Sequence, residues 1–71
     1  MNSHLKLKNR IKEMRQERGW SQTELAKRAG STQNTISSLE TGQYSPTAFL
    51  AAVLCAVFEC KFEDLFWLDK E

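Results

Sequence analysis

The sequence contains few of the residues that mark a metal-binding or disulfide-bonded protein. Its 71 residues include two cysteines and one histidine. Cys55 and Cys60 form no Cys-x-x-Cys pair and lie far along the chain from His4, so we expect no metal site and no cofactor. Cys55 falls inside an apolar stretch, which favours free thiols packed as small hydrophobic side chains over the alternative, a disulfide.

A membrane span and a secretion signal are also missing. The longest apolar run, residues 48–58, is too short to cross a bilayer. Residues 1–4 lack the basic start and apolar centre of a signal peptide. We therefore expect a cytoplasmic protein without membrane contact. With 41% hydrophobic and 27% charged residues, the chain has the composition of one globular domain.

The residue patterns of an enzyme are equally scarce. The single histidine lies in an N-terminal arm, residues 1–4, that we expect to be flexible. No paired acidic residues suggest a cleft, and no glycine-rich loop could hold a phosphate. The sequence therefore predicts a binding protein and not an enzyme.

The net charge of the chain is small, but the charged residues are unevenly distributed. The net charge is only +1, yet residues 1–30 carry eight lysines and arginines against three glutamates, while residues 31–71 have a net charge of −4. Such a dipole would orient the protein as it approaches DNA. For Lys6, Lys8 and Lys12 taken individually, we favour a solvated helix face.

Residues 21–40 have the pattern of a helix-turn-helix. Ser21 and Glu24 form a capping box, in which the serine caps the helix start and the glutamate reaches back to the cap amide. Gly30 allows the turn, Thr32 caps the second helix, and Gly42 ends it. Two capped helices joined by a glycine turn are typical of DNA-reading proteins.

Periodicity predicts three further helices around the same core. Leu7, Ile11 and Met14 indicate a helix over about residues 5–18. Ser45 and Pro46 would open the next helix as cap and first residue, and it would run to about residue 58. The last helix would span about residues 62–68, and Trp20 would plug the core. We found no alternation typical of strands, so the expected fold is all-α, with five helices in a domain over residues 5–68 and a tail at 69–71.

The second helix of the helix-turn-helix presents a polar face. Ile36 and Leu39 point inward, which leaves an outer face of uncharged side chains: Gln33, Asn34, Ser37 and Ser38. An amide can match the donor and acceptor of an adenine edge, and hydroxyls can serve either role. These four residues are our candidates for base reading, although a solvated helix face would have the same composition.

The chain resembles a known family over residues 5–66. The matching positions are Arg10, Leu25, Ala26, Thr35-Ile36-Ser37, Glu40, Gly42, Pro46 and Phe62-Glu63-Asp64-Leu65-Phe66. They resemble the lambda-repressor-like, Cro-type helix-turn-helix family of bacterial and phage regulators, also called the xenobiotic-response-element (XRE) family. The resemblance implies a compact five-helix domain that binds double-stranded DNA.

The resemblance also implies roles for residues around the outer face. Gln22 would bind a DNA phosphate, and Thr32, Gln43 and Tyr44 would approach the backbone beside it. Arg15 would pair with Glu40 as a structural link between the first helix and the recognition helix.

Several positions depart from the family pattern. The recognition helix has no lysine or arginine, so affinity would depend on phosphate contacts elsewhere. Glu59 stands where glycine is frequent, which would strain a left-handed conformation. Lys61 replaces a capping residue, which would weaken the last helix by about 1 kcal/mol.

The helix expected to end at residue 58 is apolar on almost every side. Phe49, Val53 and Ala56 form a stripe in addition to the core-facing Leu50, Leu54 and Val57. We expect this stripe, with Phe66 or Trp67, to join two copies in a symmetric homodimer. The alternative is that Phe66 and Trp67 fold back and cover the stripe within one domain.

These features predict a sequence-specific transcriptional regulator, of the repressor type, that binds a palindromic operator as a dimer. No small-molecule effector is evident. The alternative function is a protein-interaction module that keeps the fold without specific DNA binding.

Overall fold

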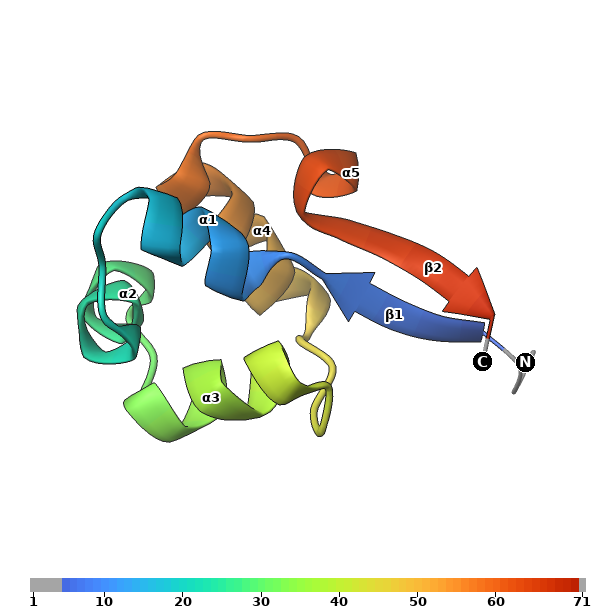
Figure 1. Cartoon of the computed structure of the whole chain (residues 1–71), viewed down its shortest axis with the longest axis horizontal. Coiled ribbons are helices and arrows are strands. Elements are labelled where there is room, and N and C mark those ends of the chain that lie inside the picture. Colours follow the sequence, from blue (N-terminus) through green and yellow to red (C-terminus); the bar gives the residue numbers. More distant parts are fainter. Residues whose placement is uncertain (1–4, 71) are drawn as a thin grey trace.

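The computed structural model describes residues 5–70, which form five helices and a two-stranded antiparallel sheet (Figure 1). Most of the chain is helical, and the five-helix domain predicted from the sequence is confirmed. None of the helices within residues 5–70 has both the length and the apolar content needed to cross a bilayer. In chain order the elements are β1 (Leu5–Asn9), α1 (Ile11–Glu17), α2 (Gln22–Ala29), α3 (Gln33–Thr41), α4 (Ala48–Phe58), α5 (Phe62–Leu65) and β2 (Phe66–Lys70).

The two strands correct the predicted ends of the domain. The helix expected from residue 5 begins only at Ile11, and residues 5–9 form β1 instead. β2 replaces the end of the last predicted helix and extends to Lys70, into the expected tail. Apolar and charged side chains alternate from Leu5 to Lys8, which is the two-residue period of a strand. We missed this period because Leu7 also fits the helical spacing that continues through α1.

The sheet turns one face toward the core. Leu7 lies opposite Leu68, and Asn9 lies opposite Phe66. Because paired residues share a sheet face, these four side chains lie on the same side. Phe66 is fully buried and Leu7 packs against the core, so this face holds the two-stranded sheet against the helices.

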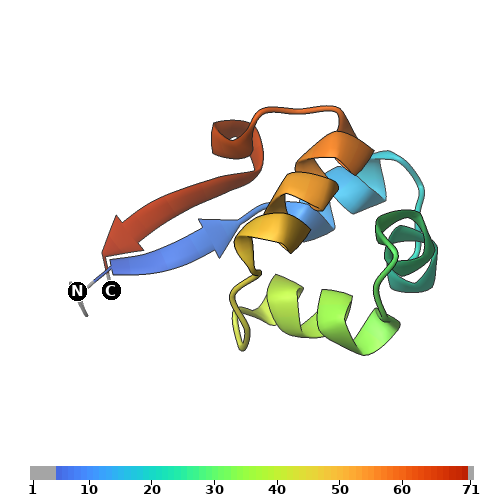
Figure 2. The same cartoon turned by 180° about the vertical axis from the view of Figure 1, so that it is seen from behind.

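The core lies between the helices and the inner end of the sheet. Trp20 is half-buried and stacks on Phe58 with ring centroids 5.8 Å apart, as expected for a core plug. α4 lies behind α1 in Figure 1 and faces the viewer in Figure 2. The largest fully buried side chains are Ile11, Leu25, Ile36, Leu39, Leu54, Phe58, Leu65 and Phe66.

The helix boundaries follow local capping signals in most places. Ser21 Oγ accepts a hydrogen bond from the Glu24 amide at 3.0 Å, and Thr32 Oγ1 accepts one from the Thr35 amide at 3.2 Å. The carboxylate of Glu24 pairs with Arg28 at 2.9 Å and does not close the predicted box. Gly30 and Gly42 have positive φ angles of 64° and 80°, which end α2 and α3 as predicted.

α4 begins at a different cap residue from the one predicted, and it ends in a left-handed residue. Thr47, and not Ser45, caps this helix: its hydroxyl accepts a hydrogen bond from the Leu50 amide at 3.1 Å. Pro46 therefore lies in the preceding loop. Glu59 ends α4 with φ 55°, which is the strained left-handed conformation predicted for it.

Candidate nucleic-acid interface

α2 and α3 form the helix-turn-helix. The turn at residues 30–32 is closed by the Ser31 amide, which donates to the carbonyl of Ala26 at 2.8 Å. Leu25 and Ala26 of α2 and Ile36 and Leu39 of α3 are buried where the helices pack. The opposite side of α3 carries no other element and lies along the lower edge of the molecule in Figure 1. The buried side of α3 is therefore held against the core, and the opposite face of α3 stays open.

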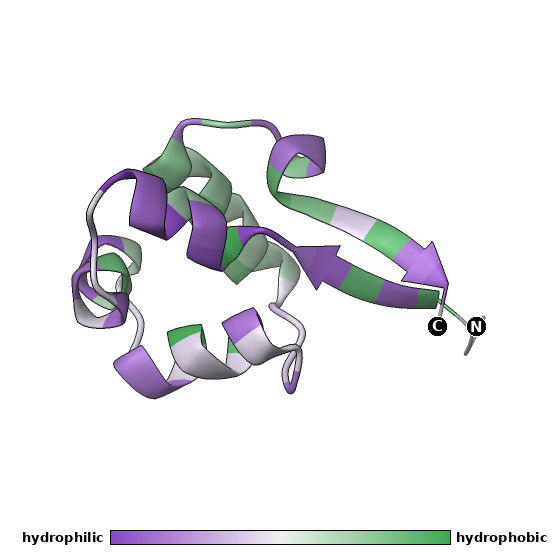
Figure 3. Ribbon diagram, viewed as in Figure 1, coloured by the Kyte–Doolittle hydropathy of each residue, from purple (hydrophilic) through white to green (hydrophobic). Residues whose placement is uncertain are grey.

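The open face of α3 carries the four residues proposed to read bases. Gln33 and Asn34 are exposed at its first turn, and Ser37 and Ser38 are half-buried one turn later. No lysine or arginine lies in the helix. Figure 3 shows it mostly pale or purple, the colours of intermediate and hydrophilic residues. The face can therefore offer donors and acceptors to a base edge without attracting phosphates by charge.

A chain of polar contacts runs from the interior to this face. Arg15 and Glu40 form the ion pair that the family resemblance implied, with Nε 2.7 Å from Oε2 and a second bond of 3.1 Å from Nη2 to Oε1. The hydrogen bond to Glu40 raises the pKa of Arg15 despite its burial. Gln22 Nε2 donates to Glu40 Oε1 at 3.0 Å, and Gln33 Nε2 donates to Gln22 Oε1 at 2.6 Å.

The direction of these bonds follows from the chemistry of the first partner. A carboxylate only accepts, so Gln22 must turn its amide nitrogen toward Glu40 and its oxygen toward Gln33. Gln33 must then donate, which leaves its own oxygen and one N–H available. That is the pair of groups that an adenine edge requires. The sequence did not reveal this contact, because Gln22 and Gln33 are brought together only by the angle between α2 and α3.

A shallow depression of about 280 Å³ lies beside the recognition face. Tyr44 forms one wall, and Asn34, Thr35 and Ser38 form the rest. Tyr44 thus flanks the base-reading side chains, while Gln43 is exposed next to it in the loop. Thr35 is not among the residues predicted to contact DNA, because in the sequence it only matches the family pattern.

Thr32 and Thr35 lie together at the start of α3. The hydroxyl of Thr32 donates to that of Thr35 at 2.9 Å, so the cap side chain is held in place at the open face. Thr32 is exposed, and Gln22 is half-buried beside the same end of the helix.

The apolar stripe of α4 remains uncovered in the described chain. The side chain of Phe49 is 79% exposed, Ala56 is exposed and Val53 is half-buried. α4 is green along its whole length in Figure 3, in keeping with its apolar composition. The interpretation that Phe66 and Trp67 cover this stripe is therefore wrong.

The predicted dimer surface nevertheless needs correction. Phe66 is only 1% exposed and belongs to the core, because its sheet face packs against the helices. Trp67 points to the other sheet face, where the Arg10 guanidinium lies 4.7 Å from its ring centre. Phe66 is thus excluded from the proposed surface, whereas the stripe on α4 and Trp67, which is 37% exposed, stay accessible.

Cys55 and Cys60 are half-buried free thiols. Burial is the main cause that raises the pKa of both, so each stays protonated at neutral pH. Within residues 5–70 no cluster of histidine, cysteine and acidic side chains could hold a metal ion. His4 lies outside the described residues.

Known proteins share this arrangement. A helix-turn-helix family model matches residues 11–65. The HTH-type transcriptional regulator YgzD of Bacillus subtilis is 42% identical over 65 residues, which cover 92% of this chain and 98% of that protein. An HTH-type transcriptional regulator of Archaeoglobus fulgidus is 45% identical and covers 92% of each chain.

The crystal structure of the transcriptional regulator VanUg has the same fold. It superposes with a TM-score of 0.81 over 99% of this chain and 93% of its own, at 15% sequence identity.

The chain belongs to the XRE-type helix-turn-helix family. It is an HTH-type transcriptional regulator, and this family is not enzymatic.

Proposed function

We propose that the protein is a sequence-specific repressor that binds double-stranded DNA as a symmetric homodimer on a palindromic operator. The observation that carries this proposal is the amide of Gln33, which Gln22 holds at the open start of α3 with a donor and an acceptor unused. A fixed amide discriminates between base edges better than a mobile one, because less conformational entropy is lost on binding. Asn34, Ser37 and Ser38 would complete the reading of each half-site.

Contacts to the phosphate backbone would come from both ends of α3. Gln22 keeps one amide N–H, and Thr32 lies exposed at the same end. Gln43 and Tyr44 follow the other end of the helix. Such contacts would fix the position of α3 in the major groove without reading sequence.

Two copies are needed because one α3 can read only a few base pairs. Recognition helices of a dimer bind half-sites about 34 Å apart, one helical turn of DNA. The stripe of Phe49, Val53 and Ala56 supports association through α4, since a self-complementary apolar surface can meet its own copy across a two-fold axis. Occupancy of an operator that overlaps a promoter would then repress transcription without a small-molecule effector.

The test is selection of bound duplexes from a random pool, followed by binding titrations. The proposal predicts a palindromic consensus with half-sites one helical turn apart. Enrichment of an unpaired half-site would contradict the dimer, and enrichment of nothing would contradict specific recognition. If no duplex is retained even at low salt, the protein-interaction module becomes the better function.

A further inference from the structure

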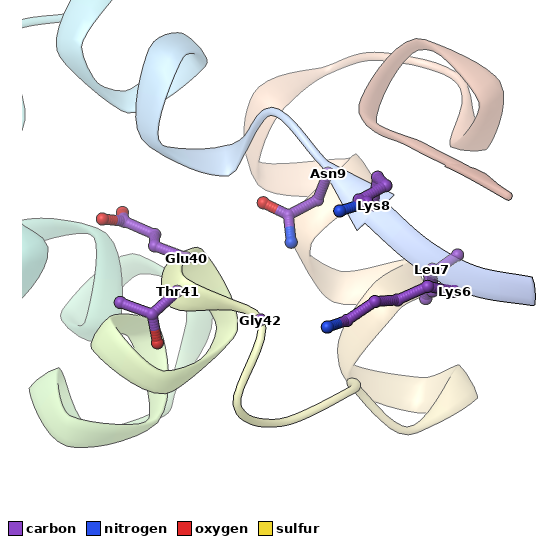
Figure 4. A pocket seen from close by; sticks show the side chains of 7 residues that line it. All are labelled: Lys6, Leu7, Lys8, Asn9, Glu40, Thr41 and Gly42. Carbon is purple, nitrogen blue, oxygen red and sulfur yellow. The ribbon is translucent and has the colours of Figure 1, made fainter. Parts of the chain in front are cut away.

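A cleft away from the four proposed base-reading residues lies between β1 and the end of α3. It has a volume of about 140 Å³ and is lined by Lys6, Leu7, Lys8 and Asn9 of the strand and by Glu40, Thr41 and Gly42 of the helix end. Figure 4 shows the ammonium groups of Lys6 and Lys8 turned toward the α3 side of the cleft. Two cations from one strand therefore stand next to a recognition helix that has none.

The strand is fixed to the recognition helix by Asn9. Its Nδ2 donates to the carbonyl of Leu39 at 3.0 Å, and its Oδ1 accepts from the amide of Ile11 at 3.1 Å. Leu39 lies in the last turn of α3. Lys6 and Lys8 thus keep their position relative to α3, as a backbone-contacting group must if it is to set the register of that helix in the groove.

The acidic side chain in the cleft does not oppose an anion strongly. Glu40 is 4% exposed, and its two oxygens accept from Arg15 and Gln22. Its charge is therefore compensated by a guanidinium within 3 Å. The two lysines therefore bring two positively charged side chains to the lining of the cleft.

The cleft also continues the side of α3 that the proposed function turns toward the backbone. Thr41 and Gly42 form its wall, and the loop with Gln43 and Tyr44 begins at the next residue. Figure 4 shows the side chain of Lys6 pointing toward Gly42, the residue before that loop.

We propose that Lys8, together with Lys6, binds a backbone phosphate of the DNA at this cleft. This inference rests on the proposed DNA-binding function and adds an electrostatic contact from the N-terminal strand. It revises the interpretation of these lysines as a solvated face. A purely structural role is the competing explanation, since cations near the last turn of a helix also interact favourably with its dipole.

The experiment measures the salt dependence of binding to a random-sequence duplex for wild type, Lys8→Gln, Lys6→Gln and the double variant. Each phosphate contact contributes about 0.9 to the slope of log K against log salt concentration. Because the two lysines share one phosphate, the double variant should lower the slope by about 1 and each single variant by less. Lys8→Arg should restore the slope of wild type, and thermal unfolding should not change.

Lys61→Gln is the matched control, because Lys61 is exposed directly before α5. α5 and α3 lie on opposite sides of the molecule in Figure 1. This control removes the same charge and should leave the slope unchanged. A slope unchanged in the double variant, or lowered equally by Lys61→Gln, would overturn the inference while the DNA-binding function stands. A lower stability with an unchanged slope would assign the lysines to the helix dipole. If wild type binds no duplex, the proposed function fails and this inference fails with it.

Discussion

Gln33 Nε2 donates a hydrogen bond of 2.6 Å to Gln22 Oε1, which joins the first residue of α3 to the first residue of α2. Gln22 is fixed in turn by Glu40, and Glu40 by the buried Arg15. The proposed base-reading amide is therefore oriented by a contact that begins in the interior. Substitutions of the residues in this series of contacts should affect DNA recognition and fold stability to different degrees.

Replacing Gln33 should reduce discrimination at one base pair of each half-site. Gln33→Ala would remove the proposed bidentate contact, and a contact of this kind is worth about 1 to 3 kcal/mol in favour of the preferred base. Titrations with the selected operator and its single-base variants would measure this loss. Binding to random DNA should hardly change, and an unaltered preference in both Gln33→Ala and Asn34→Ala would contradict the assignment of α3 as the reading helix.

Gln22→Ala should have a broader effect than the loss of one phosphate contact. It removes the proposed backbone contact, which should weaken binding to all sequences. It also releases the amide of Gln33, which should lower discrimination at the base that Gln33 is proposed to read. The same titrations separate the two effects. Uniform weakening with full discrimination would show that Gln33 does not need Gln22 to keep its orientation.

Arg15→Met should destabilise the fold strongly. Removing one partner of a buried pair leaves Glu40 as an uncompensated buried charge, at a cost of about 3 to 5 kcal/mol. Denaturant unfolding would measure it. Glu24→Gln is the matched control, because it breaks the exposed pair with Arg28 and should cost less than about 1 kcal/mol; equal losses in the two variants would contradict the structural role of Arg15.

The two thiols should make the folded state less stable at alkaline pH. Burial raises the pKa of Cys55 and Cys60 in the folded state above the unfolded value. The stability that the protonated thiols contribute is then fully present below the unfolded pKa, about 8.5, and is lost as the pH rises further. The midpoint of thermal unfolding should fall above that pH, and the decline should be smaller in a Cys55→Ala, Cys60→Ala variant. An identical decline in both proteins would assign it to other groups.

Phe49→Lys should dissociate the proposed dimer without unfolding the domain, because the side chain is 79% exposed in the single chain. A charge at the centre of an apolar interface is costly to bury. Sedimentation of this variant should show a monomer, and its circular dichroism should show unchanged helical content. Gln16→Lys adds the same charge at an exposed site on α1 and should remain a dimer. Wild type that sediments as a monomer at high micromolar concentration would contradict association through α4.

The predictable parts of this fold were those with local signals. Ser21, Thr32 and Gly30 act within a few residues of their own position, so the helix-turn-helix could be located from the sequence. β1 could not, because Leu7 fits both a strand and the helix that follows, and its pairing partner Leu68 lies at the other end of the chain. The inward orientation of Phe66 depends on that same pairing. Whether a side chain such as Gln22 contacts Gln33 depends on how two helices pack, which spacing alone does not encode.

The proposed function requires the protein to recognise a specific palindrome as a dimer. The most direct measurement is a titration of the selected operator and of a scrambled duplex with the same base composition, with the stoichiometry of the complex determined by sedimentation. Recognition of a palindrome by a dimer predicts two chains per operator and an affinity for it at least about a thousandfold higher than for the scrambled duplex. Equal affinity for both duplexes, or one chain per operator at saturation, would contradict it.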